Sequence, residues 1–461
     1  MDIGDVPVVR MFTHKGLHYV YDLYKNQVLN ISHEHYKELL HLHKIGIGMY
    51  KKLASNKKPY IDIIALISCG YFSSSKIDEI KHPYDEKLKF AIERFMQDMI
   101  LQVTQKCNFN CRYCLYSGNI GVERNHSNRD MDWSTAKKSV DYLRLHSLDS
   151  EIITIGFYGG EPFLNFPLIE RITEYVSDLF VTKQVNFITT TNGSLLSDEI
   201  IHFLVKHSFS TLISLDGTPT MHNKTRKMRL DGSDTFGIIF KNLKKIMLHH
   251  PKYFERNITI NSVLSDEIEV KEAQTFFIEN GIPKEKIIFN KTNLSGLEYI
   301  SSGVLDGAYK ISKEEANYGL VFDPDKNEAY ALFKKKLSEN STIPKKWHHD
   351  GQCIPLSRRL FVTASGNLYP CEKIIENDAF CFGNIDCEEI SINKIRKLLN
   401  IGKLSENECK KCWAIRFCEM CISHCLDAER KCLSSATKAF YCELTKKKIL
   451  GYMKMYVEET E

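Results

Sequence analysis

The sequence lacks a long apolar run, an excess of charge of one sign and a cleavable N-terminal signal. Its most apolar stretch, YIDIIALISCGYF at 60–72, is short and contains Asp62, so it predicts a core helix. The start, MDIGDVPVVRMFTHKG, has no cationic segment followed by apolar residues, which argues against secretion. The 62 Lys and Arg residues nearly balance the 58 Asp and Glu residues. We therefore expect a cytoplasmic protein with neither a membrane nor a nucleic acid as partner.

Cysteine is absent from 115–352, although the chain has 15 cysteines in all. Cys69 stands alone, three cysteines lie within 107–114, and the remaining eleven lie within 353–442. A reducing compartment argues against a disulfide framework, and the close spacing of many of these cysteines indicates metal binding. The sequence thus predicts two separate metal-binding regions.

The middle of the chain alternates between short β-rich stretches and amphipathic helical stretches. A chain of 461 residues is too long for one core, so several domains are expected. The β-rich stretches lie at 99–104, 152–158, 185–191, 210–216, 258–264 and 286–290. Strands that alternate with helices predict an α/β fold with a parallel sheet, and ligand sites of such sheets lie at the carboxyl ends of the strands.

The two ends of the chain have different patterns. Two alternating stretches precede a helical stretch that Ser32 opens and Gly46 and Gly48 end, which is the outline of a small winged-helix-like module. After 346, regular periodicity fades and cysteines, glycines and turn residues increase, which predicts a fold held more by metal than by a large core, closed by a helix at TKKKILGYMKMYVEETE. We expect domains at 1–95, 96–310 and 346–461, with a helical bridging region at 311–345.

The segment CNFNCRYC places three thiols at Cys107, Cys111 and Cys114, with no fourth ligand nearby. By itself this triplet also fits a zinc knuckle or buried structural cysteines. One strand and helix later, the turn Gly159-Gly160-Glu161-Pro162 follows the second strand. Together the Cys-x3-Cys-x2-Cys spacing and the GGEP element resemble the motifs of radical S-adenosylmethionine (radical SAM) enzymes, which have a partial (β/α)6 barrel.

The resemblance implies that three thiolates hold a [4Fe–4S] cluster whose fourth iron binds the amino and carboxylate groups of S-adenosylmethionine. An electron passed to the sulfonium then releases a 5′-deoxyadenosyl radical, while the protein orients the cofactor. It also implies that Gly159 and Gly160 let the backbone approach the methionyl amine, and that Glu161 accepts a hydrogen bond from it.

Further cofactor contacts are implied by weaker matches. Tyr113 is expected near the adenine, and Asn192 in TTTNG and Asn261 in ITINSV are expected at the ribose or adenine. Ser214 in SLDG resembles the serine that binds the methionyl carboxylate, and Arg226 is expected to supply its counter-charge. Each of these residues alone also fits an ordinary turn or strand end.

The C-terminal cysteines resemble those of the SPASM domain, which carries two auxiliary [4Fe–4S] clusters. The implied ligands are Cys353, Cys371, Cys409, Cys412, Cys418, Cys421, Cys425 and Cys442. The spacing between Cys418 and Cys421 is one residue shorter than in the family pattern, so the bridging role of Cys421 or Cys425 stays open. Cys381, Cys387 and Cys432 remain as spares, substrate-facing thiols or alternative ligands. A zinc ribbon at Cys409, Cys412, Cys418 and Cys421 is the alternative.

Enzymes that combine these two domains mainly modify ribosomally made peptides (RiPPs), and the resemblance therefore implies a peptide maturase. Residues 1–95 resemble a RiPP recognition element, which pairs a leader peptide with a sheet edge by β-augmentation. A plain structural cap is the alternative. Basic side chains could attract an acidic leader: Lys15, Lys25, Lys51, Lys52, Lys57 and Lys58.

The main hypothesis is an oxidoreductase that forms a thioether from a Cys sulfur to a carbon of another residue in a precursor peptide. Such a reaction needs a one-electron donor such as flavodoxin or ferredoxin. Other hypotheses are an anaerobic sulfatase maturase that makes formylglycine, a metal-bound protein with a decayed site, and a dehydrogenase of a small alcohol. No general base is assignable, and His222 is interpreted as an exposed loop histidine.

Overall fold

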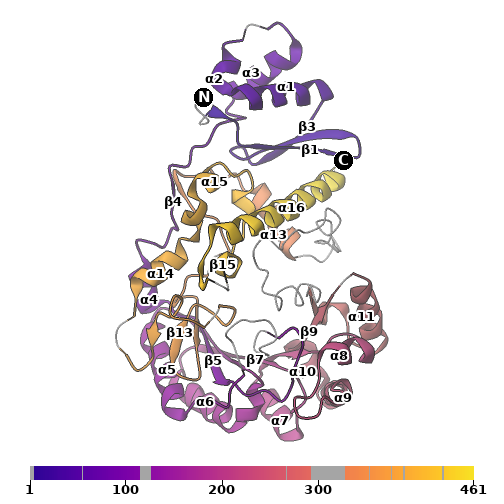
Figure 1. Ribbon diagram of the computed structural model, residues 1–461, viewed down its shortest axis with the longest axis vertical. Coiled ribbons are helices and arrows are strands. Elements are labelled where there is room, and N and C mark those ends of the chain that lie inside the picture. Colours follow the sequence, from indigo (N-terminus) through magenta and orange to yellow (C-terminus); the bar gives the residue numbers. More distant parts are fainter. Residues whose placement is uncertain are drawn as a thin grey trace.

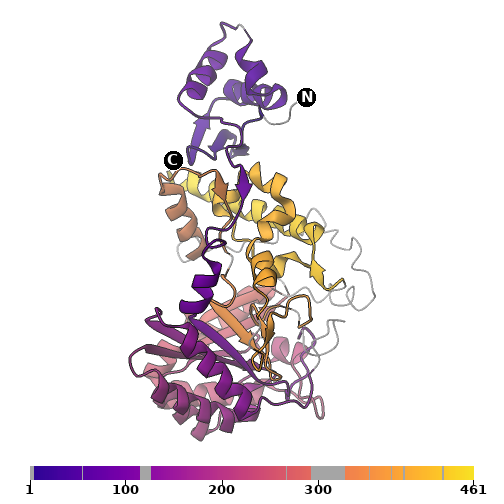
Figure 2. The same ribbon diagram turned by 90° about the vertical axis from the view of Figure 1, so that its left-hand side faces the viewer.

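The computed structural model describes residues 5–53, 55–114, 126–265, 267–291, 328–351, 353–374, 376–387, 390–427 and 430–460. The N-terminal strands and helices lie at one end of an elongated molecule, and a large sheet covered by helices lies at the other (Figure 1). The C-terminal region, coloured orange to yellow, lies between them, as the second view confirms (Figure 2).

The N-terminal region is a three-stranded antiparallel sheet followed by three helices. The elements are β1 (Val9–His14), β2 (Leu17–Asp22), β3 (Gln27–Ile31), α1 (His33–Ile45), α2 (Ile47–Lys51) and α3 (Lys58–Ser68). Ser32 caps α1 by accepting a hydrogen bond from the backbone N–H of His35, and the helix ends at Gly46, which has a φ of 82°. The sequence indicated two strands here, and the structure adds β3 as the second edge of the sheet, in the order β1-β2-β3.

The two faces of this small sheet pack on different parts of the chain. Successive side chains of a strand point to opposite faces, so Val20 packs with the helices α1 to α3 while its neighbours Tyr19 and Tyr21 point the other way. Tyr19 and Tyr21 belong to a core shared with Phe333 and Tyr452 from two C-terminal helices. The N-terminal region is therefore built onto the rest of the molecule through a hydrophobic core.

The large sheet contains all six strands that the sequence predicts. They are β5 (Asp98–Thr104), β6 (Ile152–Gly159), β7 (Gln184–Thr191), β8 (Ser210–Ser214), β9 (Ile258–Leu264) and β10 (Ile287–Lys291). Neighbouring strands pair in parallel in the order β10-β9-β8-β7-β6-β5. The helices around them are α5 (Trp133–His146), α6 (Phe166–Leu179), α7 (Asp198–Lys206), α8 (Pro219–Thr225), α9 (Phe236–His249), α10 (Pro251–Asn257) and α11 (Glu267–Glu279).

Three strands from the C-terminal region extend the same sheet. β12 (Arg359–Val362) pairs in parallel with β5, and β13 (Asn367–Tyr369) and β14 (Gly383–Asn384) continue in antiparallel pairing. Leu360, Phe361 and Leu398 are buried in the core of the large sheet. The expectation that metal more than a large core holds the region after 346 is thus wrong for this part, because its apolar residues pack in the core of the large sheet.

The remaining elements connect these parts. They are β4 (Glu79–Ile80), α4 (Leu88–Arg94), α13 (Glu328–Ser338), β11 (Lys346–Trp347), α14 (Ile392–Leu399), α15 (Glu406–Lys410), β15 (Leu426–Asp427), β16 (Cys432–Leu433) and α16 (Ser435–Thr460). The expected helical bridge is present as α13, and 311–327 lie outside the described residues. The closing helix begins at Ser435, earlier than the sequence indicates. In the described part of the chain, no helix is long and apolar enough to span a membrane.

Candidate functional site

The cysteine loop, which contains Cys107, Cys111 and Cys114, follows β5 at the carboxyl end of the parallel strands. This loop runs antiparallel to residues 225–229, which follow α8. Backbone hydrogen bonds join Asn110 N to Lys227 O at 2.9 Å and Arg112 N to Thr225 O at 2.9 Å. The two segments therefore hold the cysteine loop as a short ribbon.

Arg229 fastens the base of this loop with its side chain. Its Nε donates to the carbonyl of Cys107 at 3.0 Å, and its Nη2 donates to the carbonyl of Phe109 at 3.3 Å. Sequence reasoning missed Arg229, because a cation in a run of basic residues is usually a solvated surface residue. Only the pairing with the cysteine loop distinguishes it.

The thiols of this loop lie close enough to affect one another, and Cys111 is buried while Cys107 and Cys114 are partly buried. Burial raises the pKa of Cys107 to about 12, and the charges of Glu161, Cys111 and Cys114 add to the shift. Among the described residues, no three His, Cys, Asp or Glu side chains are placed to hold one metal ion. Cysteine thiolates are the usual ligands of iron–sulfur clusters, so three cysteines in one loop fit such a cluster.

The glycines of GGEP pack directly on the cysteine loop. Gly160 N donates to Thr104 O at 3.0 Å, and Glu161 N donates to Lys106 O at 2.8 Å. A Cβ at Gly160 would lie 2.1 Å from the carbonyl oxygen of Lys106, and Gly159 has a φ of 142°. Only glycine fits these two positions, because any side chain would displace the cysteine loop.

Glu161 is fully buried and connects the second strand to the third. Its carboxylate accepts hydrogen bonds from the Thr191 hydroxyl at 2.8 Å, from Asn192 N at 2.7 Å and from Phe163 N at 3.3 Å. Burial raises its pKa to about 7, while these hydrogen bonds act in the opposite direction. The chain itself thus supplies three donors to the carboxylate, and an additional bond from a methionyl amine stays a prediction.

Asn192 links the third strand to the cysteine loop. Its Nδ2 donates to Asn108 Oδ1 at 2.8 Å, and its Oδ1 accepts from Ser194 N at 2.9 Å. Asn108 in turn donates to the Ser194 hydroxyl at 2.9 Å. The structure therefore brings Asn192 to the cysteine loop, and it adds Asn108 and Ser194, which carried no signal in the sequence.

Tyr113 and Arg226 meet at a carboxylate that the sequence analysis did not select. Arg226 binds Asp216 through Nε at 2.7 Å and Nη2 at 3.2 Å, and Tyr113 donates its hydroxyl to the same carboxylate at 2.6 Å. The Arg226 guanidinium lies 5.2 Å from the centre of the Tyr113 ring. Burial raises the pKa of the Cys111 thiol to about 11, and the Arg226 charge acts in the opposite direction. Arg226 thus has Asp216 as its counter-ion in this structure, and its expected role as counter-charge of a methionyl carboxylate stays a prediction.

Ser214 and Asn261 are paired with each other on the sheet. Ser214 is the last residue of β8 and lies opposite Asn261 of β9. The amide oxygen of Asn261 accepts a hydrogen bond from Asn290 Nδ2 at 2.6 Å. Ser214 ends its strand, Asn261 lies in the middle of β9, and the cofactor contacts expected of both stay predictions.

His222 is buried, so its interpretation as an exposed loop histidine is wrong. Its Nδ1 accepts a hydrogen bond from Asp216 N at 3.1 Å, and its Nε2 pairs with the Thr235 hydroxyl at 2.9 Å. Burial, strengthened by the Arg226 charge, lowers its pKa to about 3. The neutral ring fixes the Asp216 backbone and so supports the ion pair with Arg226.

The C-terminal cysteines gather in two groups. In the first, the Cys421 charge acts on the thiols of both Cys353 and Cys371, next to the ion pair of Arg359 and Glu372 at 2.6 Å. Burial raises the pKa of Cys371 to about 12. Cys421 therefore lies with the cysteines near β12 and β13, as a bridging ligand would.

The second group lies around the start of α16. The charges of Cys409 and Cys442 act on the thiols of both Cys412 and Cys418. Burial raises the pKa of Cys412 to about 11. Cys425 is buried and interacts with members of both groups, Cys442 and Cys421 among them. Its alternative role as a bridging ligand thus stays possible on position alone. The spares are placed differently: Cys381 donates to Gly383 O at 3.1 Å, and Cys387 and Cys432 are exposed.

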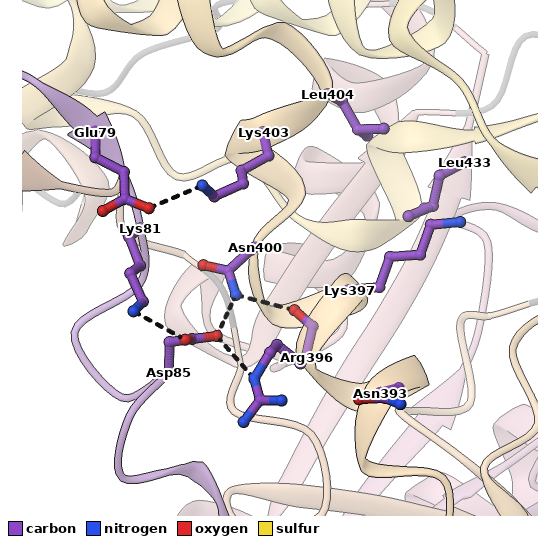
Figure 3. A pocket seen from close by; sticks show the side chains of 10 residues that line it. All are labelled: Glu79, Lys81, Asp85, Asn393, Arg396, Lys397, Asn400, Lys403, Leu404 and Leu433. Carbon is purple, nitrogen blue, oxygen red and sulfur yellow. Dashed lines mark hydrogen bonds and ion pairs between the residues drawn. The ribbon is translucent and has the colours of Figure 1, made fainter.

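A separate pocket lies where the linker after the N-terminal region meets α14 (Figure 3). Asp85 receives Asn400 Nδ2 at 2.7 Å, Lys81 at 3.3 Å and Arg396 at 3.3 Å, and Lys403 pairs with Glu79 at 3.0 Å. None of its lining residues comes from the loops after β5 to β10. These interactions fasten the linker to the C-terminal region, and the pocket is not part of the cysteine site.

Comparisons with known proteins agree with this geometry. Residues 101–267 match the model of the Radical SAM superfamily. An uncharacterised protein, MJ0907 of Methanocaldococcus jannaschii, is 39% identical over 122 residues, which are 26% of this chain and 39% of that protein. The radical SAM cyclopropyl synthase TigE of Paramaledivibacter caminithermalis is 22% identical over 69% of this chain and 66% of its own length. The chain thus spans less than two thirds of these two relatives.

A sulfatase maturase is similar over a larger share of its length. The cysteine-type anaerobic sulfatase-maturating enzyme of Clostridium perfringens is 24% identical over 75% of this chain and 93% of its own length. The solved structure of native anSMEcpe with bound AdoMet superposes with a TM-score of 0.54, at 21% identity, over 79% of this chain and 99% of that one. This likeness shows a shared fold.

The superfamily match covers the end of β5, the cysteine loop, GGEP and the Asp216–Arg226 pair, which are the features that converge at one edge of the sheet. The cofactors of this superfamily are S-adenosylmethionine and a [4Fe–4S] cluster, and the Cys-rich C-terminal region fits auxiliary clusters of the SPASM type. Residues 101–267 are therefore similar to the Radical SAM superfamily, and within them Cys107, Cys111 and Cys114 are the residues that would hold such a cluster.

Proposed function

We propose that this protein is a radical SAM peptide maturase that forms a crosslink in a ribosomally synthesised precursor peptide, with a Cys sulfur-to-carbon thioether as the favoured product. The observation that carries the proposal is the combination of three features in one chain. They are a radical SAM cysteine loop, two further groups of cysteines, and an N-terminal sheet with two outer strands.

The N-terminal region supplies the place for the leader peptide. β1 and β3 are the outer strands of the sheet, and an extended peptide adds to such an edge through main-chain hydrogen bonds. Tyr19 and Tyr21 are occupied by the shared core on one face, and α1 to α3 cover the other, so binding would use the strand edges. The RiPP recognition element resemblance and the acidic leader remain part of this proposal.

The residues of the radical SAM domain would bind the cluster and orient S-adenosylmethionine. Cys107, Cys111 and Cys114 would hold the cluster, which supplies the one-electron chemistry when S-adenosylmethionine binds. The Asp216–Arg226 pair and Glu161 fix the loops around it, and their burial excludes water from the loop bases. The C-terminal cysteine groups suit a net oxidation, because closing a new bond releases an electron that an auxiliary cluster can accept.

Formylglycine formation in a sulfatase is the second candidate. The similarity to the Clostridium perfringens sulfatase maturase over 93% of that enzyme favours it. The N-terminal region favours the peptide maturase, since conversion of one side chain to an aldehyde does not obviously need a separate leader-docking module. A cyclopropyl product, as in the name of TigE, is a carbon–carbon variant of the first proposal.

The deciding experiment uses anaerobically reconstituted enzyme, reductant, S-adenosylmethionine and the Cys-containing peptide encoded beside the gene. Intact mass and fragmentation are read together with thiol alkylation. Loss of a hydrogen pair with thiols that no longer alkylate supports a thioether. The same loss with free thiols moves the bond to carbon–carbon or carbon–oxygen, and an aldehyde that reacts with a hydrazide supports formylglycine. Deoxyadenosine without any peptide change rejects the substrate assignment.

A further inference from the structure

Lys438 is a fully buried lysine, which is rare unless the ammonium group has a partner. Its side chain is 1% exposed and lies in the first turn of α16. The Nζ donates to the sulfur of Cys409 at 3.1 Å and to the hydroxyl of Ser405. Ser405 in turn lies 3.5 Å from the same sulfur.

The surroundings of Lys438 offer sulfur in place of carboxylate. Besides Cys409, the charges that stabilise its ammonium form are those of Cys442 and Cys425. In the part of the chain that the structure describes, no Asp or Glu lies within ion-pair distance of Lys438. His348 and His349 lie nearby, and burial lowers their pKa to about 3 and about 4, so both rings are neutral at physiological pH.

A buried ammonium without a counter-charge costs several kcal/mol, so a protein retains one where an anion lies beside it. Neutral thiols do not provide that anion. Four thiolates around a [4Fe–4S] cluster carry a net negative charge, which increases when the cluster gains an electron. The position of Lys438 is therefore explained by a charged cluster at Cys409, Cys412, Cys418 and Cys442.

We propose that Lys438 is a positioning residue of this second cysteine centre, where its ammonium group and its hydrogen bond to Cys409 raise the reduction potential of the auxiliary cluster. The inference rests on the auxiliary clusters of the proposed function and adds a residue that tunes one of them. Hydrogen bonds to cluster sulfurs and nearby positive charge both favour the reduced state, since that state is the more negative one. Such a cluster is the better electron acceptor.

The test is a redox titration of the reconstituted full chain, in which electron paramagnetic resonance measures the reduced clusters at each potential. Replacing Cys107, Cys111 and Cys114 with alanine first removes the signal of the radical SAM cluster. In this background, Lys438→Met keeps the side-chain volume and removes the charge, and Lys447→Met is the control at an exposed lysine of the same helix. We expect the midpoint potential of one auxiliary centre to fall in Lys438→Met, while the other centre and the control stay unchanged.

Each other outcome has a defined meaning. An unchanged potential with full iron content in Lys438→Met overturns the inference, as does an equal shift in the control. If Lys438→Met loses iron from one centre, Lys438→Arg decides. If Lys438→Arg restores the iron, the result supports a charge effect. If both variants lose iron, Lys438 has a packing role and the inference is overturned. Zinc in place of iron at the C-terminal cysteines also overturns it and leaves the radical SAM domain unaffected. No peptide enters the titration, so a wrong substrate assignment does not affect this result.

Discussion

Arg226 and Asp216 form a buried two-point ion pair, with side chains that are 7% and 1% exposed. The carboxylate also receives the Tyr113 hydroxyl and the backbone N–H of Val263. Tyr113 comes from the cysteine loop, and Val263 comes from β9. The Asp216 carboxylate, which follows β8, thus connects the cysteine loop to β9.

Loss of this ion pair should cost far more stability than loss of an exposed one. Arg226→Met leaves Asp216 buried without its counter-charge, and we expect the free energy of unfolding to fall by about 3–5 kcal/mol. The control is Arg94→Met, which breaks a two-point pair with Asp149 at 2.6 and 2.7 Å on the surface and should cost much less stability, because water screens exposed charges. Urea denaturation of the protein without clusters measures both. Equal losses would contradict the buried role.

The radical SAM loop should account for one cluster and for all cleavage of S-adenosylmethionine. Cys111→Ala removes a buried thiol of the loop, so iron content should fall by one cluster and deoxyadenosine formation should be abolished. Cys69→Ala removes an exposed cysteine of the N-terminal region and should change neither quantity. Iron analysis and chromatography of the nucleoside products give the answer. Retained deoxyadenosine formation in Cys111→Ala would reject the assignment of this loop.

The close packing of GGEP on the cysteine loop makes Gly160 sensitive to a single methyl group. In Gly160→Ala the Cβ would lie 2.1 Å from Lys106 O and 3.0 Å from Cys107 Cβ, so the loop has to move. We expect at least a tenfold loss of deoxyadenosine formation, equivalent to about 1.4 kcal/mol. Gly237→Ala is the matched control, because no atom lies within 4 Å of its Cβ position. Full activity of Gly160→Ala would show that the loop adapts without cost.

His222 should make the protein less stable as the pH falls below 6.5. Its pKa in the folded state is about 3, which is below that of the unfolded chain, so the unfolded state binds more protons between these two values. The contribution of the neutral ring is complete above pH 6.5 and decreases by about 1.4 kcal/mol for each pH unit below it. His222→Asn keeps an acceptor for Asp216 N and removes the titration.

The measurement is the free energy of unfolding between pH 7 and 4.5 for the wild type and the variant. The stability advantage of the wild type should shrink by about 2–3 kcal/mol over this range. His249→Asn, at an exposed position, serves as the control. A constant difference between the wild type and His222→Asn would show that the buried ring does not resist protonation.

The strands β5 to β9 were predictable because each is a short stretch rich in apolar and β-branched residues, followed along the chain by a helical stretch. The cysteine loop and GGEP were predictable because their spacing along the chain is part of the motif. The partner of Arg226 was not predictable, since several acidic residues lie within reach in sequence and only the fold selects Asp216. His222 stands in the polar segment MHNKTR, and it is buried because the fold places it against Asp216, Thr235 and Phe236.

The pairing of strands that are far apart in the chain could not be predicted from the sequence either. The parallel pairing of Leu360 with Met99 joins segments that are far apart in the chain, and no local pattern encodes it. The same holds for the cysteines, because the position of Cys421 beside Cys353 and Cys371 depends on how the C-terminal region folds. Local periodicity thus gives the elements, and tertiary packing gives the ligand groups.

The pairing of β12 with β5 also means that the large sheet is completed only late in synthesis of the chain. A ribosome releases the cysteine loop long before residues 359–362, so β5 has an open edge for most of synthesis. An unpaired strand edge attracts other chains until its partner arrives. A shortened chain that stops at 267 would keep the whole superfamily match and still expose this edge, so the catalytic motif and the smallest unit that folds are not the same stretch of sequence.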